Sequence, residues 1–186
     1  MPAPWGKVRP TPDIFPRIQT IASVSDRAMR LNQLRELREF VKRLCKAGLL
    51  LYPDTQPNQR LQRVGQRMKW TQINQYDICD AIIKVIIPNK FSCSWVEVVA
   101  DGQKNPSRYF CSHFWGESFR DFMSTVEHHA QMNKVCSHEG YWICVYANDQ
   151  HKVELGTSLK DSPFYQALKV AEGGTMVFLD KECEAL

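Results

Sequence analysis

The sequence predicts an α/β fold in which helices flank a parallel sheet and a basic helical segment precedes it. Short apolar runs at 93–99, 109–112, 141–147 and 175–179 have the length and composition of strands. Helix-length segments separate the last three runs, as in right-handed βαβ units. The run 141–147 is apolar throughout, which is typical of a strand covered on both faces of a sheet.

A basic amphipathic helix is predicted over 25–47. Ser25 is a suitable N-cap, and Gly48 stands where a glycine commonly ends a helix. An apolar stripe recurs at helical spacing, and we expect it to pack on the α/β domain: Leu34, Leu37, Val41 and Leu44.

Three further helices are predicted downstream. The first covers 72–86 and can be capped by Thr71. The second covers 117–131 and places its large apolar residues on one side. The third begins at Ser162-Pro163, which is an N-cap followed by a proline in the first turn.

We divide the chain into a mobile, proline-spaced arm (1–20), a basic helical extension (21–69) and the α/β domain (70–186). No apolar run approaches the ~20 residues of a membrane span, and no secretory signal is recognisable. The cysteines are odd in number, and Cys111 and Cys144 fall in predicted core strands. We therefore expect free thiols and a cytoplasmic location.

The net charge of +4 hides an asymmetry between the two ends of the chain. Residues 1–70 contain 14 Lys/Arg and 5 Asp/Glu, a balance of +9, whereas residues 71–186 contain 10 and 15, a balance of −5. The basic residues of 27–69 could bind nucleic acid or an anionic membrane surface. They could equally pair with acidic residues of the same chain.

Polar turns follow two of the predicted strands. The exit loops of neighbouring parallel strands open on the same edge of a sheet, so we expect these two turns to meet. The side chains that would line their shared cleft are Ser112, His113, Trp115, Glu117, Asn148, Asp149 and His151. An aromatic wall with amide and imidazole groups suits a nucleotide or another flat polar ligand. Alternatively, the two turns only pack against the protein and face solvent.

Two other kinds of chemistry fit the sequence less well. A Cys-x-His pair occurs at Cys111/His113 and at Cys136/His138, but neither has the Cys-x-x-Cys spacing of common structural zinc sites, so we expect no metal. A cysteine nucleophile would place Cys144 beside His113, loosely as in caspase-type peptidases. Because Cys144 lies within the predicted strand 141–147, we expect its sulfur to be buried and unreactive.

Three ordered segments, 95–99, 109–117 and 141–151, resemble an uncharacterised family that is expanded in single-celled algae. The family has a Ser-His-Trp-Trp-Gly turn and a Tyr-Ala-Asn-Asn-Gln-His strand end. This family in turn distantly resembles Toll/interleukin-receptor (TIR) domains. That resemblance implies a flavodoxin-like parallel sheet and places Ser112, His113 and Glu117 beside the nucleotide pocket of the enzymatic members.

The resemblance implies a TIR-like module of intracellular signalling that binds a protein partner or a nucleotide-type ligand. TIR enzymes that cleave NAD use a glutamate in a Trp-Cys-x-x-Glu-like helix. Only Glu182 and Glu184 follow 175–179 here, so we expect a truncated domain or a lost catalytic segment, which argues against NAD cleavage. Two alternatives stay open: a nucleotide-processing hydrolase at the same cleft, and a nucleic-acid or anionic-surface binder that uses residues 27–69.

Overall fold

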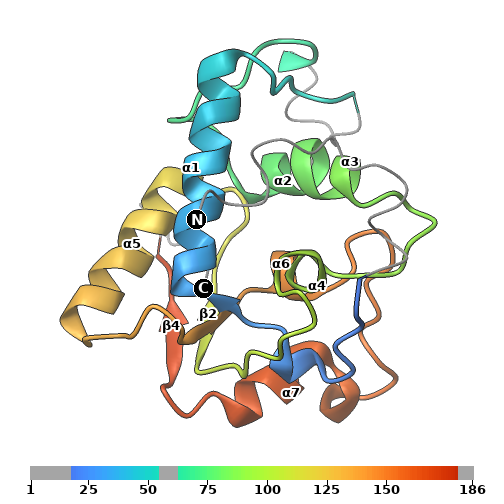
Figure 1. The fold of residues 1–186 in the computed structure, drawn as a ribbon, viewed down its shortest axis with the longest axis vertical. Coiled ribbons are helices and arrows are strands. Elements are labelled where there is room, and N and C mark those ends of the chain that lie inside the picture. Colours follow the sequence, from blue (N-terminus) through green and yellow to red (C-terminus); the bar gives the residue numbers. More distant parts are fainter. Residues whose placement is uncertain (1–17, 55–62, 180–186) are drawn as a thin grey trace.

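A computed structural model describes residues 18–54 and 63–179, which form a four-stranded sheet flanked by helices (Figure 1). Most of the predicted arm 1–20 lies outside the described residues, as do Glu182 and Glu184. The strands, in their order across the sheet, are β1 (Met29–Arg30), β3 (Gly140–Trp142), β2 (Tyr109–Ser112) and β4 (Thr175–Val177).

The sheet is mainly parallel. β2 pairs in parallel with both β3 and β4, whereas β1 pairs antiparallel with β3. The prediction of an α/β fold with a helix-flanked, mostly parallel sheet is confirmed. The prediction of a wholly parallel sheet is wrong, because residues 29–30, which were assigned to a helix, add an antiparallel edge strand. The flavodoxin-like arrangement stays a prediction.

The side chains of β2 and β3 alternate between two hydrophobic cores. Tyr109 and Tyr141 stack with ring centroids 5.1 Å apart, and both belong to the larger core. The next pair, Phe110 and Trp142, stacks at 5.3 Å within a smaller core. The two-residue period of a strand sends successive side chains to opposite faces. β4 is an edge strand with two exposed residues, so the predicted burial of 175–179 is wrong except at Phe178.

Helices α1 (Leu31–Ala47) and α5 (Phe119–Met132) lie side by side over the larger core (Figure 1). The apolar stripe predicted for α1 packs there, which confirms that prediction. The helix begins at Leu31 rather than Ser25, because Val24–Asp26 forms a separate 3-10 turn and β1 follows it. Gly48 ends α1 in the left-handed conformation, with a φ of 66°.

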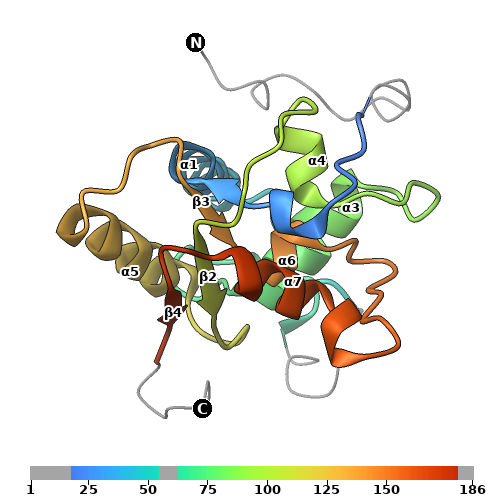
Figure 2. The same cartoon turned by 90° about the horizontal axis from the view of Figure 1, so that it is seen from below.

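The smaller core is covered by α7 (Pro163–Val170), on the other side of the sheet from α1 and α5 (Figure 2). Ser162 caps α7 as predicted, because its hydroxyl accepts a hydrogen bond from Phe164 N. The predicted helix 72–86 consists of α2 (Gln75–Ile78), a π-helical turn (Cys79–Ile83) and α3 (Lys84–Ile86). Asn74, and not Thr71, is its N-cap.

Two predicted strands contain helix instead. In 93–99 the structure has α4 (Trp95–Val99), and in 141–147 the strand ends at Trp142 and α6 (Cys144–Ala147) follows. Hydrophobic periodicity does not distinguish a short buried strand from a buried helical turn of the same length. In α4 the helical conformation is favoured by a capping box in which Ser94 accepts from Glu97 N and the Glu97 carboxylate accepts from Ser94 N.

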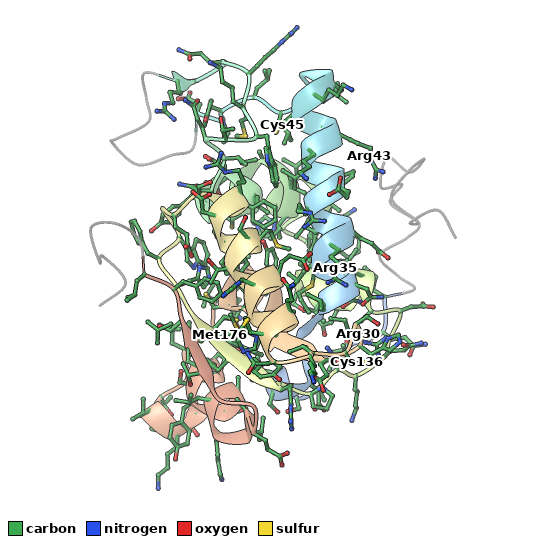
Figure 3. The ribbon with its side chains drawn as sticks, turned by 90° about the vertical axis from the view of Figure 1, so that its left-hand side faces the viewer. Arg30, Arg35, Arg43, Cys45, Cys136 and Met176 are labelled. Carbon is green, nitrogen blue, oxygen red and sulfur yellow. The ribbon has the colours of Figure 1, made fainter. Side chains whose placement is uncertain are left out.

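Several basic side chains of α1 pair with acidic side chains of the same chain. Arg35, which is labelled in Figure 3, and Arg38 both donate to the carboxylate of Glu127 on α5, at 2.7 and 3.0 Å. Arg38 and Lys42 also contact Glu39. These pairs neutralise part of the charge asymmetry seen in the sequence.

Candidate functional site

The candidate site lies where the two central parallel strands end. β2 ends at Ser112 and the chain turns at His113, while β3 ends at Trp142 and α6 begins at Cys144. Phe110 is paired with Trp142 in the parallel register. His113 and Cys144 therefore leave the sheet at the same edge, although 31 positions separate them in the sequence.

Three side chains form a line at this edge, in the order Cys144, His113, Glu117. The distance from Cys144 Sγ to His113 Nε2 is 4.0 Å, and that from His113 Nδ1 to Glu117 Oε1 is 3.6 Å. The indole Nε1–H of Trp115 donates to Cys144 Sγ at 3.2 Å. The sulfur thus lies between an imidazole nitrogen and an indole N–H.

The imidazole and the carboxyl group of this line are buried. The side chains of His113 and Glu117 are 1% and 9% exposed, and the rings of Phe122 and Phe178 lie beside the imidazole. Burial alone lowers the pKa of His113, but the Cys144 sulfur and the Glu117 carboxylate favour the imidazolium and raise the pKa to about 9. At neutral pH, His113 is therefore a cation between two acceptors.

The raised pKa of His113 predicts a protein that loses stability as the pH rises from about 6.5 to about 9. The free energy of unfolding should fall because the folded protein keeps a proton that the unfolded chain releases in this range. The loss over the whole range is on the order of 3 kcal/mol. Urea unfolding followed by circular dichroism at about pH 7 and about pH 8 measures the central part of it.

Other groups with shifted pKa values change the stability mainly at pH values other than those at which His113 does. Burial lowers the pKa of His129, which therefore contributes at lower pH, while burial raises the pKa of Cys111 and Cys79, whose thiols contribute as the pH passes the ordinary thiol pKa of about 8.5, above the two measured pH values. Glu117 and Cys144 are the ionisable groups that face the imidazole. His113→Gln should remove most of the pH dependence and His128→Gln, at an exposed position on α5, should keep it. A wild-type stability that stays constant between about pH 6.5 and about pH 9 contradicts the prediction.

A hollow of about 440 Å³ lies beside Trp115 and Gln150, which both contact Cys144. Its wall contains the rings of Tyr76 and Trp115, whose centroids are 5.3 Å apart. Asp80 and Lys84, paired at 2.8 Å, also line it. Gln150 completes the connection to the site, because this side chain lines the hollow and donates to the carbonyl oxygen of Cys144 at 3.2 Å.

The structure brings four of the predicted site residues to one place and separates the other three from it. Ser112, His113, Trp115 and Glu117 lie at the end of β2 and in the turn that follows it. The remaining three lie elsewhere: Asn148 and Asp149 line a second hollow of about 410 Å³, and His151 Nε2 contacts the carbonyl oxygen of Ile87 at 2.6 Å. The one-turn helix α6 causes this separation, since it carries the chain towards α4, and Ser92, in the segment before α4, donates to Asp149.

The site contains residues that sequence reasoning did not assign to it. Cys144 was expected inside a core strand, and that prediction is wrong because β3 ends at Trp142, which leaves Cys144 half-buried at the start of α6. Tyr76 and Gln150 were also missed. One signal could have identified Cys144. It follows Tyr141 at nearly the same spacing as His113 follows Tyr109, and these two tyrosines are paired in the parallel sheet.

The fold and the site define a mixed α/β protein with a cysteine, a histidine and a glutamate aligned at the carboxyl edge of its central strands. Comparisons with protein-family models, with curated proteins and with solved structures found no match. Within residues 18–54 and 63–179, no three His, Cys, Asp or Glu side chains are grouped so that they could hold a metal ion. In the same residues, no helix is long and apolar enough to cross a membrane.

Proposed function

We propose that this chain is a cytoplasmic TIR-like interaction module that binds a nucleotide-type ligand in the hollow beside Trp115. The observation that carries the proposal is the aromatic wall of Tyr76 and Trp115 at the carboxyl edge of the central strands. Ligand sites in open α/β sheets lie at this edge. The volume of about 440 Å³ falls within the range of ~300–1,000 Å³ found for small-molecule sites.

The groups around the hollow suit the parts of a nucleotide. The rings of Tyr76 and Trp115 offer a surface on which a base can stack, which contributes ~1–3 kcal/mol per base in nucleic-acid complexes. Lys84 offers a cation for a phosphate. The Gln150 amide is oriented by its own hydrogen bonds, because Nε2 donates to Cys144 O and Oε1 accepts from Cys79 Sγ.

The order of the parallel strands supports the TIR-like part of the proposal. In chain order these strands are β2, β3 and β4, and in the sheet they lie as β3-β2-β4. The flavodoxin-like order 2-1-3-4-5 begins with the same arrangement. The six cysteines among the described residues are free, which supports a reducing compartment.

The basic residues of α1 give less support to the nucleic-acid alternative. Arg35 and Arg38 already donate to Glu127, so binding a phosphate would require these hydrogen bonds to break. In the hollow beside Trp115, Lys84 would likewise have to leave Asp80 to bind a phosphate, but the rings of Tyr76 and Trp115 can stack on a base without breaking a hydrogen bond to an acidic side chain.

Replacing Trp115 with alanine is expected to abolish stabilisation by a nucleotide while the protein stays folded. A ligand at 100 times its Kd stabilises a protein by about 2.7 kcal/mol, and the variant should lose most of this because the base loses its stacking surface. Without ligand, the free energy of unfolding should fall by only about 1–2 kcal/mol, since the indole is half-buried. Thermal unfolding with NAD, ADP and ATP measures both effects.

Trp70→Ala is the matched control for this experiment. Trp70 is also half-buried, but its ring packs on Phe119 with centroids 5.7 Å apart and it does not line the hollow. We expect this variant to keep the nucleotide effect. If none of the three nucleotides stabilises the wild-type protein, or if Trp115→Ala responds as the wild type does, the proposal is wrong.

A further inference from the structure

We infer that Cys144 is a nucleophile that attacks the carbonyl carbon of an ester or thioester bound beside Trp115, paired with the His113 imidazolium, which protonates the leaving group. The inference adds a covalent reaction to the proposed ligand binding and shares its hollow, but it does not depend on a nucleotide. It rests on the line of Cys144, His113 and Glu117 and on the position of this line beside Trp115.

Two ring nitrogens face Cys144 Sγ as hydrogen-bond donors. The indole N–H of Trp115, at 3.2 Å, can only donate, so the sulfur is its acceptor. His113 Nε2, at 4.0 Å, becomes a second donor once the imidazole is protonated. A cysteine beside an imidazolium is the usual form of an activated thiol.

Glu117 acts as a positioning residue for the imidazole. Its Oε1 lies 3.6 Å from His113 Nδ1, and both atoms are buried without a hydrogen-bond partner among the described residues. Buried polar atoms without hydrogen bonds lower the stability of a protein and are rare. Their presence here therefore indicates a role other than stability. Catalytic hydrogen bonds are often long in ligand-free proteins, and a shift of less than about 1 Å would form this one.

Other cysteines close to the site lack these features. Burial raises the pKa of Cys79 and Cys93 to about 12 and that of Cys111 well above the ordinary value. Their thiols are therefore protonated and inert at neutral pH. Cys144 is half-buried, and two residues that line the hollow contact it: Trp115 donates to its sulfur and Gln150 donates to its carbonyl oxygen.

The reaction has two balanced steps. The thiolate of Cys144 gives an electron pair to the carbonyl carbon, a C–S bond forms, the bond to the alcohol or thiol breaks, and the leaving group takes the proton from His113 Nε2. Water then attacks the acyl-cysteine while His113 accepts a proton from it. The C–S bond breaks, the carboxylic acid leaves, and one proton remains shared by Cys144 and His113.

Alkylation of the full chain by iodoacetamide tests the state of the thiol. At about pH 6.5 an ordinary thiol is only ~1% thiolate. Cys136 is exposed and serves as the internal reference (Figure 3). Mass spectrometry should show Cys144 reacting about fivefold faster than Cys136 or more, because a larger thiolate fraction outweighs the lower nucleophilicity of a stabilised thiolate.

Two variants test the roles of the neighbours. His113→Gln should bring the rate at Cys144 to within about twofold of the rate at Cys136, whereas His128→Gln should leave the difference unchanged. Glu117→Gln should move the pH profile of Cys144 alkylation towards alkaline pH, which loss of a merely structural contact would not do. The profile depends on the groups coupled to this pair, namely Cys111, Cys79 and Tyr146 besides Glu117.

The chromogenic ester p-nitrophenyl acetate tests the acyl step. The wild-type protein should release a burst of p-nitrophenolate and carry an acetyl group on Cys144, and Cys144→Ser should show neither. Equal alkylation of Cys144 and Cys136, no alkylation of Cys144, or no acetyl group on Cys144 would each overturn the inference. The alkylation rates of Cys144 and Cys136 are compared in the wild-type protein. This comparison therefore tests the inference even if His113→Gln does not fold. None of these measurements uses a nucleotide, so failure here and failure of the proposed ligand binding are separate results.

Discussion

Glu97→Ala is expected to lower the free energy of unfolding by about 3–5 kcal/mol, which is the usual cost of breaking a buried ion pair from one side. The Glu97 side chain is only 2% exposed and lies 3.4 Å from an Arg27 nitrogen. Its Oε1 accepts from Ile21 N at 2.8 Å, and its Oε2 accepts from Ser94 N at 2.7 Å. The carboxylate thus joins three separate parts of the chain, and alanine would leave all of these donors without their acceptor.

Urea unfolding followed by circular dichroism measures this loss as a lower midpoint. Glu97→Gln should cost less, because an amide oxygen can still accept one of the hydrogen bonds. Glu154→Ala is the surface control: Glu154 pairs only with the exposed Lys152, so its removal should leave the midpoint nearly unchanged. A loss below about 1 kcal/mol for Glu97→Ala would show that water replaces the carboxylate.

Trp142→Ala is expected to lower the free energy of unfolding by about 3–5 kcal/mol, as large-to-small changes of buried aromatic residues do. Trp142 is fully buried in the smaller core, where it stacks on Phe110 and packs edge-to-face on Phe164 of α7. Its indole N–H donates to the carbonyl oxygen of Val24 at 3.0 Å. Alanine would leave a cavity between α7 and the sheet, and the Val24 carbonyl oxygen would keep only its hydrogen bond from Arg27 N.

Hydrogen exchange can locate the effect of this substitution. Amides of α7 should exchange faster in Trp142→Ala, whereas those of α1 should change less, because α1 packs on the other core. Trp142→Phe, which keeps a ring in the cavity, should lose less stability and protect α7 better. Equal loss of protection in α1 and α7 would contradict this separation of the two cores.

Local side-chain chemistry made several elements predictable from the sequence. The Ser162-Pro163 pair marks the start of α7, Gly48 marks the end of α1, and the apolar run 109–112 is β2. Each signal acts through neighbours in the chain: a hydroxyl caps nearby N–H groups, and a glycine adopts the left-handed conformation without strain. Such signals do not need the rest of the fold.

The runs 93–99 and 141–147 were misassigned because their conformation depends on what they pack against. Both are apolar and short, and both contain buried helical turns in the structure. The consequence for the site was direct. Placing Cys144 in a continuous strand put its sulfur in the core, whereas the end of β3 at Trp142 puts it at the edge of the sheet beside His113.

The sequence by itself determined the α/β class, the strand 109–112, and the turn that carries His113, Trp115 and Glu117. These properties follow from the period of a strand and from the order of residues along one segment. Only the tertiary structure decided that Cys144 joins this turn and that Asn148 and Asp149 do not. The physical reason is that β2 pairs with β3 across more than thirty intervening positions, and the short helix α6 then turns the chain away.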